Sequence, residues 1–277
     1  MLHTWKGQCC GTYNLPRQSW VRPFKRHYNA SLTKGGRVIA ISHFIASHII
    51  ENYDTPWNKI KVIHRGIDQI SFNPDKISSY QLAQQHRHWN LPDTRQIILM
   101  PGRLTRWKGQ KILIDAIAKL PHPRPLCLII GAHQGREKYY HELEQYIVEK
   151  KLVDDVHIFE PPASIPVAMM LSDIVVSASI DPEAFGRVSA EAMMMGRMIV
   201  APNHGAACEQ IDHHQNGFLF APSNSDSLAA ILKQVLMLSP ERRMQISQHA
   251  RQKALRLFSR DLMQNKTLDL YHQLLEE

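Results

Sequence analysis

The sequence predicts an α/β fold, namely a Rossmann-like, doubly wound parallel sheet that follows a shortened N-terminal α/β portion. From residue 96 onwards, short β-branched apolar runs alternate with longer segments of helical composition, which is typical of repeated βα units. These runs are apolar throughout, as expected for strands buried on both faces of a parallel sheet. At 277 residues and 44% hydrophobic composition, the chain is long enough and apolar enough for one large or two small domains.

The first 95 residues predict only a few elements. Residues 1–30 show no sustained periodicity and predict none. Residues 36–42 predict a strand that ends at Ser42, which would cap a helix through about Tyr53. A short strand is expected at residues 61–64, and a polar helix lies within residues 71–94.

The remaining chain predicts six strands, helices between them and an amphipathic segment at the end. The expected strands are 96–101, 126–131, 155–159, 173–178, 198–201 and 217–220. The expected helices are 109–120, 137–151, 164–171, 187–195, 225–238, 240–257 and 260–275. Pro240 would occupy the first position of its helix, where its missing N–H is not needed.

Charge and composition exclude several classes of protein. The formal charge of +8 suits an acidic partner such as nucleotide phosphates, anionic lipid headgroups or nucleic acid. No nucleic-acid module is present, which disfavours a nucleic-acid binder. No run approaches the ~18 apolar residues of a membrane span, and no signal peptide is recognisable. Four cysteines without CxxC or disulfide spacing favour the cytoplasm.

Residues 181–196, DPEAFGRVSAEAMMMG, carry the strongest functional signal. The stretch begins as a loop after a buried strand and continues as a helix, with Glu183 before the helix and Glu191 inside it. Gly186 lets another group approach the backbone, and Gly196 suits the helix end. The spacing alone leaves open an ordinary βα unit with two solvated glutamates.

A second stretch, GRLTRWKG at residues 102–109, follows the first strand of the sheet. Gly102 and Gly109 bracket the cations Arg103 and Lys108, and a helix begins near Gly109. A cation pair beside a helix N-terminus is suited to a diphosphate, because Arg grips two oxygens while Lys adds a point charge. The alternative is a pair of solvated surface cations.

These two stretches resemble the motifs of family 4 glycosyltransferases, which have the GT-B fold. Residues 183–192 are similar to the E-x7-E signature of the family, and residues 102–109 match a second motif in the expected order. The resemblance runs from about Tyr28 to the C-terminus and points to bacterial members that build lipopolysaccharide and surface glycans. It implies a retaining hexosyltransferase that uses a nucleotide-diphosphate sugar and needs no metal or other cofactor.

The resemblance also implies roles for individual residues. Arg103 and Lys108 would hold the diphosphate and stabilise the charge that develops on it, and Glu183 would contact the transferred sugar or its phosphate. Glu191 would accept from the ribose hydroxyls, unless it forms only a helix-surface salt bridge. Further donor contacts are implied at Gly66, Gly102, Phe185, Gly186 and Glu209. For Glu209, a helix-starting glutamate is the alternative.

The same comparison predicts the domain organisation. Residues 1–72 would be the remnant of an acceptor-side domain, 73–257 the nucleotide-sugar-binding domain, and 258–277 a helix that returns towards the N-terminal part. Cys10 stands where the family carries a histidine. The motif near the base is replaced at residues 160–163, so base specificity cannot be carried over.

Two functions therefore stay open at this stage. The first is transfer to a glycan or lipid-linked acceptor, with peripheral contact to the anionic inner face of the membrane. The second is a non-catalytic nucleotide-sugar-binding module that a partner chain completes with an N-terminal domain.

Overall fold

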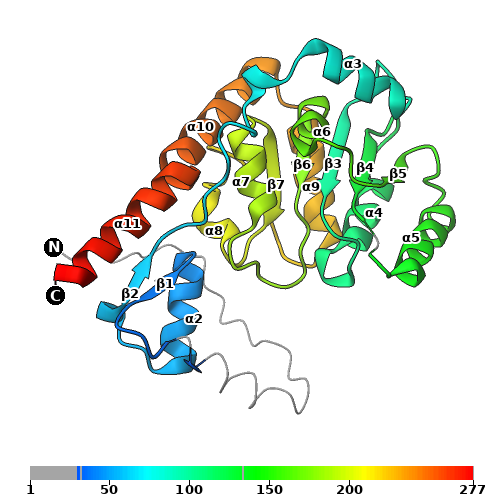
Figure 1. Ribbon diagram of the computed structural model, residues 1–277. Helices are drawn as coiled ribbons and strands as arrows, with labels where there is room; N and C mark the ends of the chain where they lie inside the picture. Colours follow the sequence, from blue (N-terminus) through cyan, green and yellow to red (C-terminus); the bar gives the residue numbers. More distant parts are fainter. Residues whose placement is uncertain (1–29, 32, 133, 277) are drawn as a thin grey trace.

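A computed structural model describes residues 30–31, 33–132 and 134–276. Its main feature is a six-stranded parallel sheet (Figure 1). The strands are β3 (Ile97–Pro101), β4 (Leu126–Ile130), β5 (Val156–Phe159), β6 (Ile174–Val176), β7 (Met198–Pro202) and β8 (Phe218–Phe220). The predicted doubly wound α/β sheet is confirmed, and each strand overlaps its predicted range.

The sheet is covered by helices on both faces, which explains why its strands are apolar throughout. One apolar cluster packs the sheet against α4 (Gln110–Ala118), α5 (Glu137–Glu149) and α9 (Ser225–Leu236). The other packs it against α6 (Ile165–Leu171), α7 (Arg187–Met194) and α10 (Pro240–Phe258). Pro240 occupies the first position of α10, as predicted, and Ser239 caps the helix by accepting from the N–H of Arg242.

The strand order is β5-β4-β3-β6-β7-β8. From β3 the chain proceeds outwards through β4 and β5, then returns to β6 beside β3 and proceeds in the opposite direction. The helices that follow β3 and β6, namely α4 and α7, therefore lie on opposite faces of the sheet. In open α/β sheets this reversal creates the crevice in which ligands bind.

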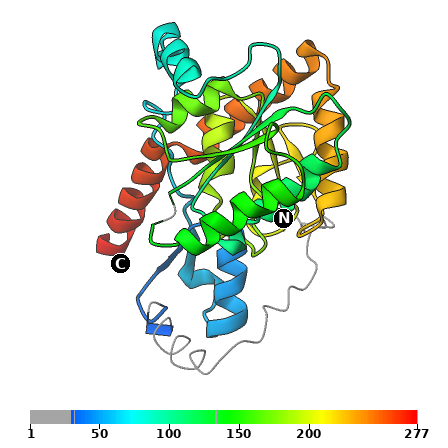
Figure 2. The same cartoon turned by 90° about the vertical axis from the view of Figure 1, so that its right-hand side faces the viewer.

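A smaller unit precedes the sheet and consists of β1 (Val38–Ala40), α2 (His43–Tyr53) and β2 (Ile60–Val62). The two strands are parallel. Ser42 caps α2 by accepting from the N–H of Ile45, as predicted. Figures 1 and 2 show this unit below the carboxyl edge of the six-stranded sheet. The loops after β6 and β7 therefore lie between the two units.

Several short elements were not predicted. They are η1 (Trp57–Lys59), η2 (Pro74–Lys76), η3 (Arg106–Lys108) and α8 (Ala207–Gln210). The predicted polar helix is α3 (Ser79–His88), which begins with a capping box formed by Ser78 and Gln81. None of the helices among the described residues is long and apolar enough to cross a membrane.

The last helix, α11 (Arg260–Glu276), runs beside the segment that joins the two units. The N–H of Ile67 donates to the carbonyl of Phe258 at 2.7 Å, and the N–H of Arg260 donates back to Ile67 at 2.9 Å. Gly66 allows this close approach, because a Cβ there would lie 2.6 Å from Cα of Arg260. The three-part division at residues 72 and 257 stays a prediction, and Cys10 lies outside the described residues.

Candidate functional site

The loop after β3 and the loop after β6 meet at the point where the strand order reverses. The Nζ of Lys108 lies 2.7 Å from Oε1 of Glu183, and both side chains are largely buried, with 14% and 18% exposed. Ser179 also donates to this carboxylate oxygen. The ammonium of Lys108 lies 4.4 Å from the ring centre of Trp107 and makes a cation–π contact with this ring.

Two glycines allow the loops to come this close. At Gly109, φ is +78° and a Cβ would lie 2.0 Å from the carbonyl oxygen of Ala178, at the end of β6. At Gly205, φ is +59° and a Cβ would lie 2.9 Å from the backbone nitrogen and oxygen of Glu183. Any side chain at either position would push the loops apart, so both glycines keep Lys108 and Glu183 in contact.

Arg103 is an exposed cation at this edge. Among the described residues its guanidinium makes no ion pair, while its backbone carbonyl accepts from Nε2 of Gln110 at 2.9 Å. The nearby cations Arg106 and Lys111 both pair with Glu142 on α5. Hydrogen bonds from these two cations lower the pKa of Glu142 to about 2. Arg103 is therefore exposed and, in the part of the chain that the structure describes, free of an ion pair, so it is available to an incoming anion.

Helix α7 begins at the same edge. Gly186 is its N-cap residue, in the left-handed region at φ +74°, and no side chain accepts from the first turn. An N-terminus without such a cap presents N–H groups and a partial positive charge to an anion. Glu191 lies in the next turn and is 9% exposed, with Oε1 2.9 Å from Nη2 of Arg187. Burial raises the pKa of Glu191, although Arg187 opposes this effect.

The backbone between Glu183 and α7 is held at two carbonyls. Ser42 Oγ donates to the carbonyl of Ala184 at 2.6 Å. The amide of Gln210, which is fully buried, donates to the carbonyl of Phe185. The ring of Phe185 points into the core, with its centre 5.7 Å from that of Phe258. The peptide that follows Phe185 is thus fixed in orientation before any ligand binds.

Glu209 lies between the small unit and the sheet. Its carboxylate accepts from the backbone N–H groups of His43 at 2.9 Å and Phe44 at 3.1 Å, and Nε2 of His64 lies 3.2 Å from Oε2. Burial opposes ionisation of Glu209, but these hydrogen bonds outweigh it and lower the pKa of the carboxyl group. Glu209 therefore binds the N-terminus of α2.

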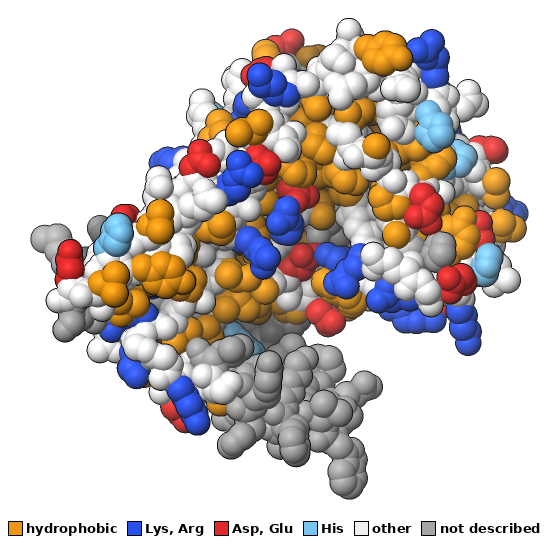
Figure 3. Space-filling view, in the orientation of Figure 1, with side chains coloured by type: hydrophobic (Ala, Val, Ile, Leu, Met, Phe, Trp, Pro, Cys, Tyr) orange, Lys and Arg blue, Asp and Glu red, His pale blue; other side chains and the backbone are white. Residues whose placement is uncertain are grey.

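The structure thus brings Lys108 and Glu183 into direct contact and places Arg103, Gly102, Gly186 and Glu191 at the same edge of the sheet. Glu209 and Gly66 lie further towards the small unit, where both contact other parts of the protein. Figure 3 shows basic side chains beside acidic ones in the hollow between the two units.

Sequence reasoning missed Ser179, which binds Glu183, and Gln210, which fixes the Phe185 carbonyl. Ser179 carried one usable signal, because it follows a buried strand at the edge where ligands bind.

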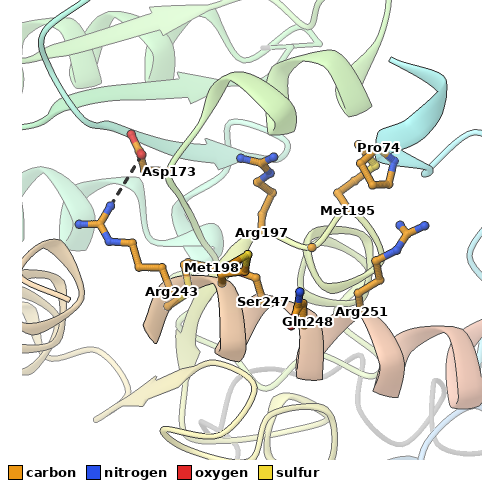
Figure 4. Close-up of a pocket in the computed structure, with 11 residues that line it drawn as sticks. Pro74, Asp173, Met195, Arg197, Met198, Arg243, Ser247, Gln248 and Arg251 are labelled. Carbon is orange, nitrogen blue, oxygen red and sulfur yellow. Dashed lines mark ion pairs between the residues drawn. The ribbon is translucent and has the colours of Figure 1, made fainter. Parts of the chain in front are cut away.

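A hollow of about 330 Å³ lies at the opposite, amino edge of the sheet (Figure 4). Its three arginines bind the ends of three helices. Arg197 donates to the carbonyl of Ser172 after α6, Arg251 to Met194 at the end of α7, and Arg243 to Leu236 at the end of α9. Cations at helix C-termini stabilise the helix dipole, so a structural role accounts for these arginines.

Two family models match the chain. The family model "Glycosyl transferases group 1" matches residues 82–253, and "Glycosyltransferase Family 4" matches residues 1–69. An uncharacterized glycosyltransferase of Methanocaldococcus jannaschii is 31% identical over 201 residues, which are 72% of this chain and 50% of that protein. The D-inositol 3-phosphate glycosyltransferase of Jonesia denitrificans is 28% identical over 186 residues, or 64% of this chain and 43% of that protein.

Solved structures extend the similarity over most of the chain. A glycosyltransferase of Rickettsia africae superposes with a TM-score of 0.86 at 34% identity, covering 96% of this chain and 69% of that one. Anabaena HepE in complex with UDP superposes with a TM-score of 0.81 at 29% identity, covering 88% and 66%. The chain spans 43–65% of the length of the first three curated relatives.

Proposed function

Because the chain belongs to the group 1 glycosyl transferases, we propose that it binds a nucleotide-diphosphate sugar at the carboxyl edge of its six-stranded sheet and transfers the hexose. The observation that carries the proposal is the Lys108–Glu183 pair at the reversal of strand order, beside the exposed Arg103. HepE was solved with UDP and with UDP-glucose, which makes uridine diphosphate the first donor nucleotide to test.

The diphosphate would lie between Arg103, Lys108 and the first turn of α7. Arg103 supplies a cation with no protein partner among the described residues, and the backbone around Gly186 supplies N–H groups. Lys108 binds Glu183 in the free chain, so the incoming phosphates compete with this carboxylate. Gly102 keeps the loop after β3 free of a side chain at this point.

The remaining donor contacts follow from the positions of the two glutamates and the loops beside them. Glu191, inside α7, would accept from the ribose hydroxyls. Glu183, released from Lys108, would face the hexose. The backbone N–H groups of Phe185 and Gly186 would contact the donor, with the preceding carbonyls already held by Ser42 and Gln210. Gly66 and Glu209 would shape the wall of the cleft on the side of the small unit.

The family resemblance implies a front-face displacement with retention of configuration, and we propose this reaction for the chain. The bond between the anomeric carbon and the phosphate oxygen breaks, and a bond from that carbon to the acceptor oxygen forms. The acceptor proton passes to an oxygen of the departing phosphate. Arg103 and Lys108 stabilise the charge that develops on the diphosphate, and loss of one such contact typically costs about 10²–10³ in rate.

For the acceptor we propose a growing surface glycan or a lipid-linked sugar, reached from the cytoplasm at the inner face of the membrane. The net charge of +8 supports contact with an anionic surface. Lipopolysaccharide synthesis is the setting that the sequence motifs favour.

The test is a thermal-shift screen of nucleoside diphosphates and nucleotide sugars, followed by transfer assays with the stabilising donor. We expect uridine diphosphate to raise Tm, and the double variant Arg103→Ala/Lys108→Ala to abolish the shift. An equal shift in this variant would reject the site.

The second candidate is a donor-binding module that a partner chain completes. Its specific support is the small unit, in which the described residues provide only a two-stranded sheet on the acceptor side. Donor binding without transfer, with transfer restored by fusion to an N-terminal domain of the family, would favour it. Full turnover by the chain alone would exclude it.

A further inference from the structure

His43, His64 and Glu209 form a cluster at the junction of the two units. Each offers one ligand atom, and these atoms all lie within 4.8 Å of one another. The residues come from the start of α2, the segment after β2 and helix α8. Two imidazoles and a carboxylate are the ligand set of many zinc sites that keep a fourth position for water. We propose that this cluster binds one Zn²⁺ or a similar divalent transition-metal ion.

The distance between His64 and Glu209 already fits such a site. Their Nε2 and Oε2 atoms are 3.2 Å apart. Two ligands at 2.0–2.1 Å from a tetrahedral zinc ion are separated by about 3.3 Å. The ion therefore takes the place of the hydrogen atom between Nε2 and Oε2, with the imidazole proton on Nδ1.

The surroundings hold two of the three ligands in place. The ring of His64 lies against Phe258 and Phe185, at 5.3 Å and 6.5 Å between ring centres. Backbone N–H groups of His43 and Phe44 donate to the two oxygens of Glu209 and fix the position of this carboxylate. A ligand held before binding loses less conformational entropy when the ion arrives.

His43 supplies the third ligand, and rotation of its side chain completes the site. Its side chain is exposed, and its ring centre lies 5.7 Å from that of His64. A rotation of this ring brings its nitrogen to the ion without disturbing the backbone of α2. Because the three ligands belong to three segments, the bound ion ties the small unit to the sheet, and Zn²⁺ stabilises the folded chain.

The experiment is a calorimetric titration of the metal-free chain with Zn²⁺, repeated for His43→Gln. Wild type should bind one ion, and the variant should bind it at least about tenfold more weakly, since even loss of a supporting contact costs 10–100-fold. His141→Gln is the matched control. This substitution removes an exposed histidine on α5 whose Nδ1 lies 3.0 Å from the carboxylate of Glu144. The His141→Gln variant should bind Zn²⁺ as wild type does.

A second readout uses Co²⁺ as the probe. The wild-type chain should give the visible absorption of four-coordinate Co²⁺, and His43→Gln should lose it while keeping its circular dichroism spectrum. Absence of saturable Zn²⁺ binding would overturn the proposal. Equal affinity in wild type and His43→Gln would also overturn it, because the ion would then be bound elsewhere, for example at the adjacent His213 and His214. Neither outcome affects the donor site, since His43 has no part in it.

Discussion

Substitution of Lys108 by alanine should weaken binding of uridine diphosphate. A hydrogen bond between charged groups contributes about 1.5–3 kcal/mol, which corresponds to about 13-fold to about 160-fold in affinity. The ligand must first draw the ammonium from Glu183, 2.7 Å away, so we expect the lower end of this range. The assay is isothermal titration calorimetry at fixed ionic strength.

The matched control is Lys111→Ala. This lysine lies on α4, and its ammonium is 2.6 Å from Glu142 on α5. Lys111 is not one of the proposed diphosphate contacts, so nucleotide affinity should hardly change in this variant. Similar affinities for the Lys108 and Lys111 variants would refute the placement of the diphosphate.

Glu183→Gln should have the opposite effect on the same assay. The substitution removes the carboxylate that competes for Lys108, so uridine diphosphate should bind about fivefold more tightly, or about 1 kcal/mol. The ligand contains no hexose, so the sugar contact of Glu183 does not enter. Weaker binding in this variant would show that Glu183 supports the diphosphate site and does not compete with it.

Three further predictions concern single positions. Glu191→Gln should weaken nucleotide binding more than pyrophosphate binding, because the proposed partner of Glu191 is the ribose. The melting temperature at pH 7 should not fall. Burial raises the pKa of Glu191, so its charged form destabilises the fold above that pKa. Gly109→Ala should lower the free energy of urea unfolding by more than Gly135→Ala does. Both glycines have φ near +77°, but only at Gly109 would a Cβ lie 2.0 Å from the carbonyl oxygen of Ala178. Equal losses of stability would contradict the close approach at Gly109. Glu209→Gln should lower stability at neutral pH, because the stabilisation needs the ionised carboxylate. The difference in stability from wild type should vanish as the pH falls through the lowered pKa of Glu209. A difference that does not depend on pH would contradict this role of the carboxylate.

The sequence was sufficient for the doubly wound sheet and for the longer strands and helices, but not for the short elements. Strands such as Ile97–Pro101 are buried on both faces, and such runs are recognisable from their β-branched composition. The cap at Ser42 was also recognisable, because it depends on local hydrogen bonds. Helix α8 was missed because four residues are too few to show a helical period.

Contacts at the site depend on long-range geometry that no local pattern contains. Lys108 and Glu183 are 75 residues apart and meet only because β6 returns to lie beside β3. His64 and Glu209 are 145 residues apart, and no spacing rule for metal ligands would pair them. The resemblance to a known family could identify residues of the donor site, but it could not show that Glu183 neutralises Lys108 in the free chain.

The most direct test of the donor site is a structure of the chain with uridine diphosphate bound. We predict the diphosphate between Arg103 and Lys108 at the start of α7, the ribose on Glu191, and Lys108 separated from Glu183. The nucleotide at the amino edge of the sheet, between Arg197 and Arg251, would contradict this account.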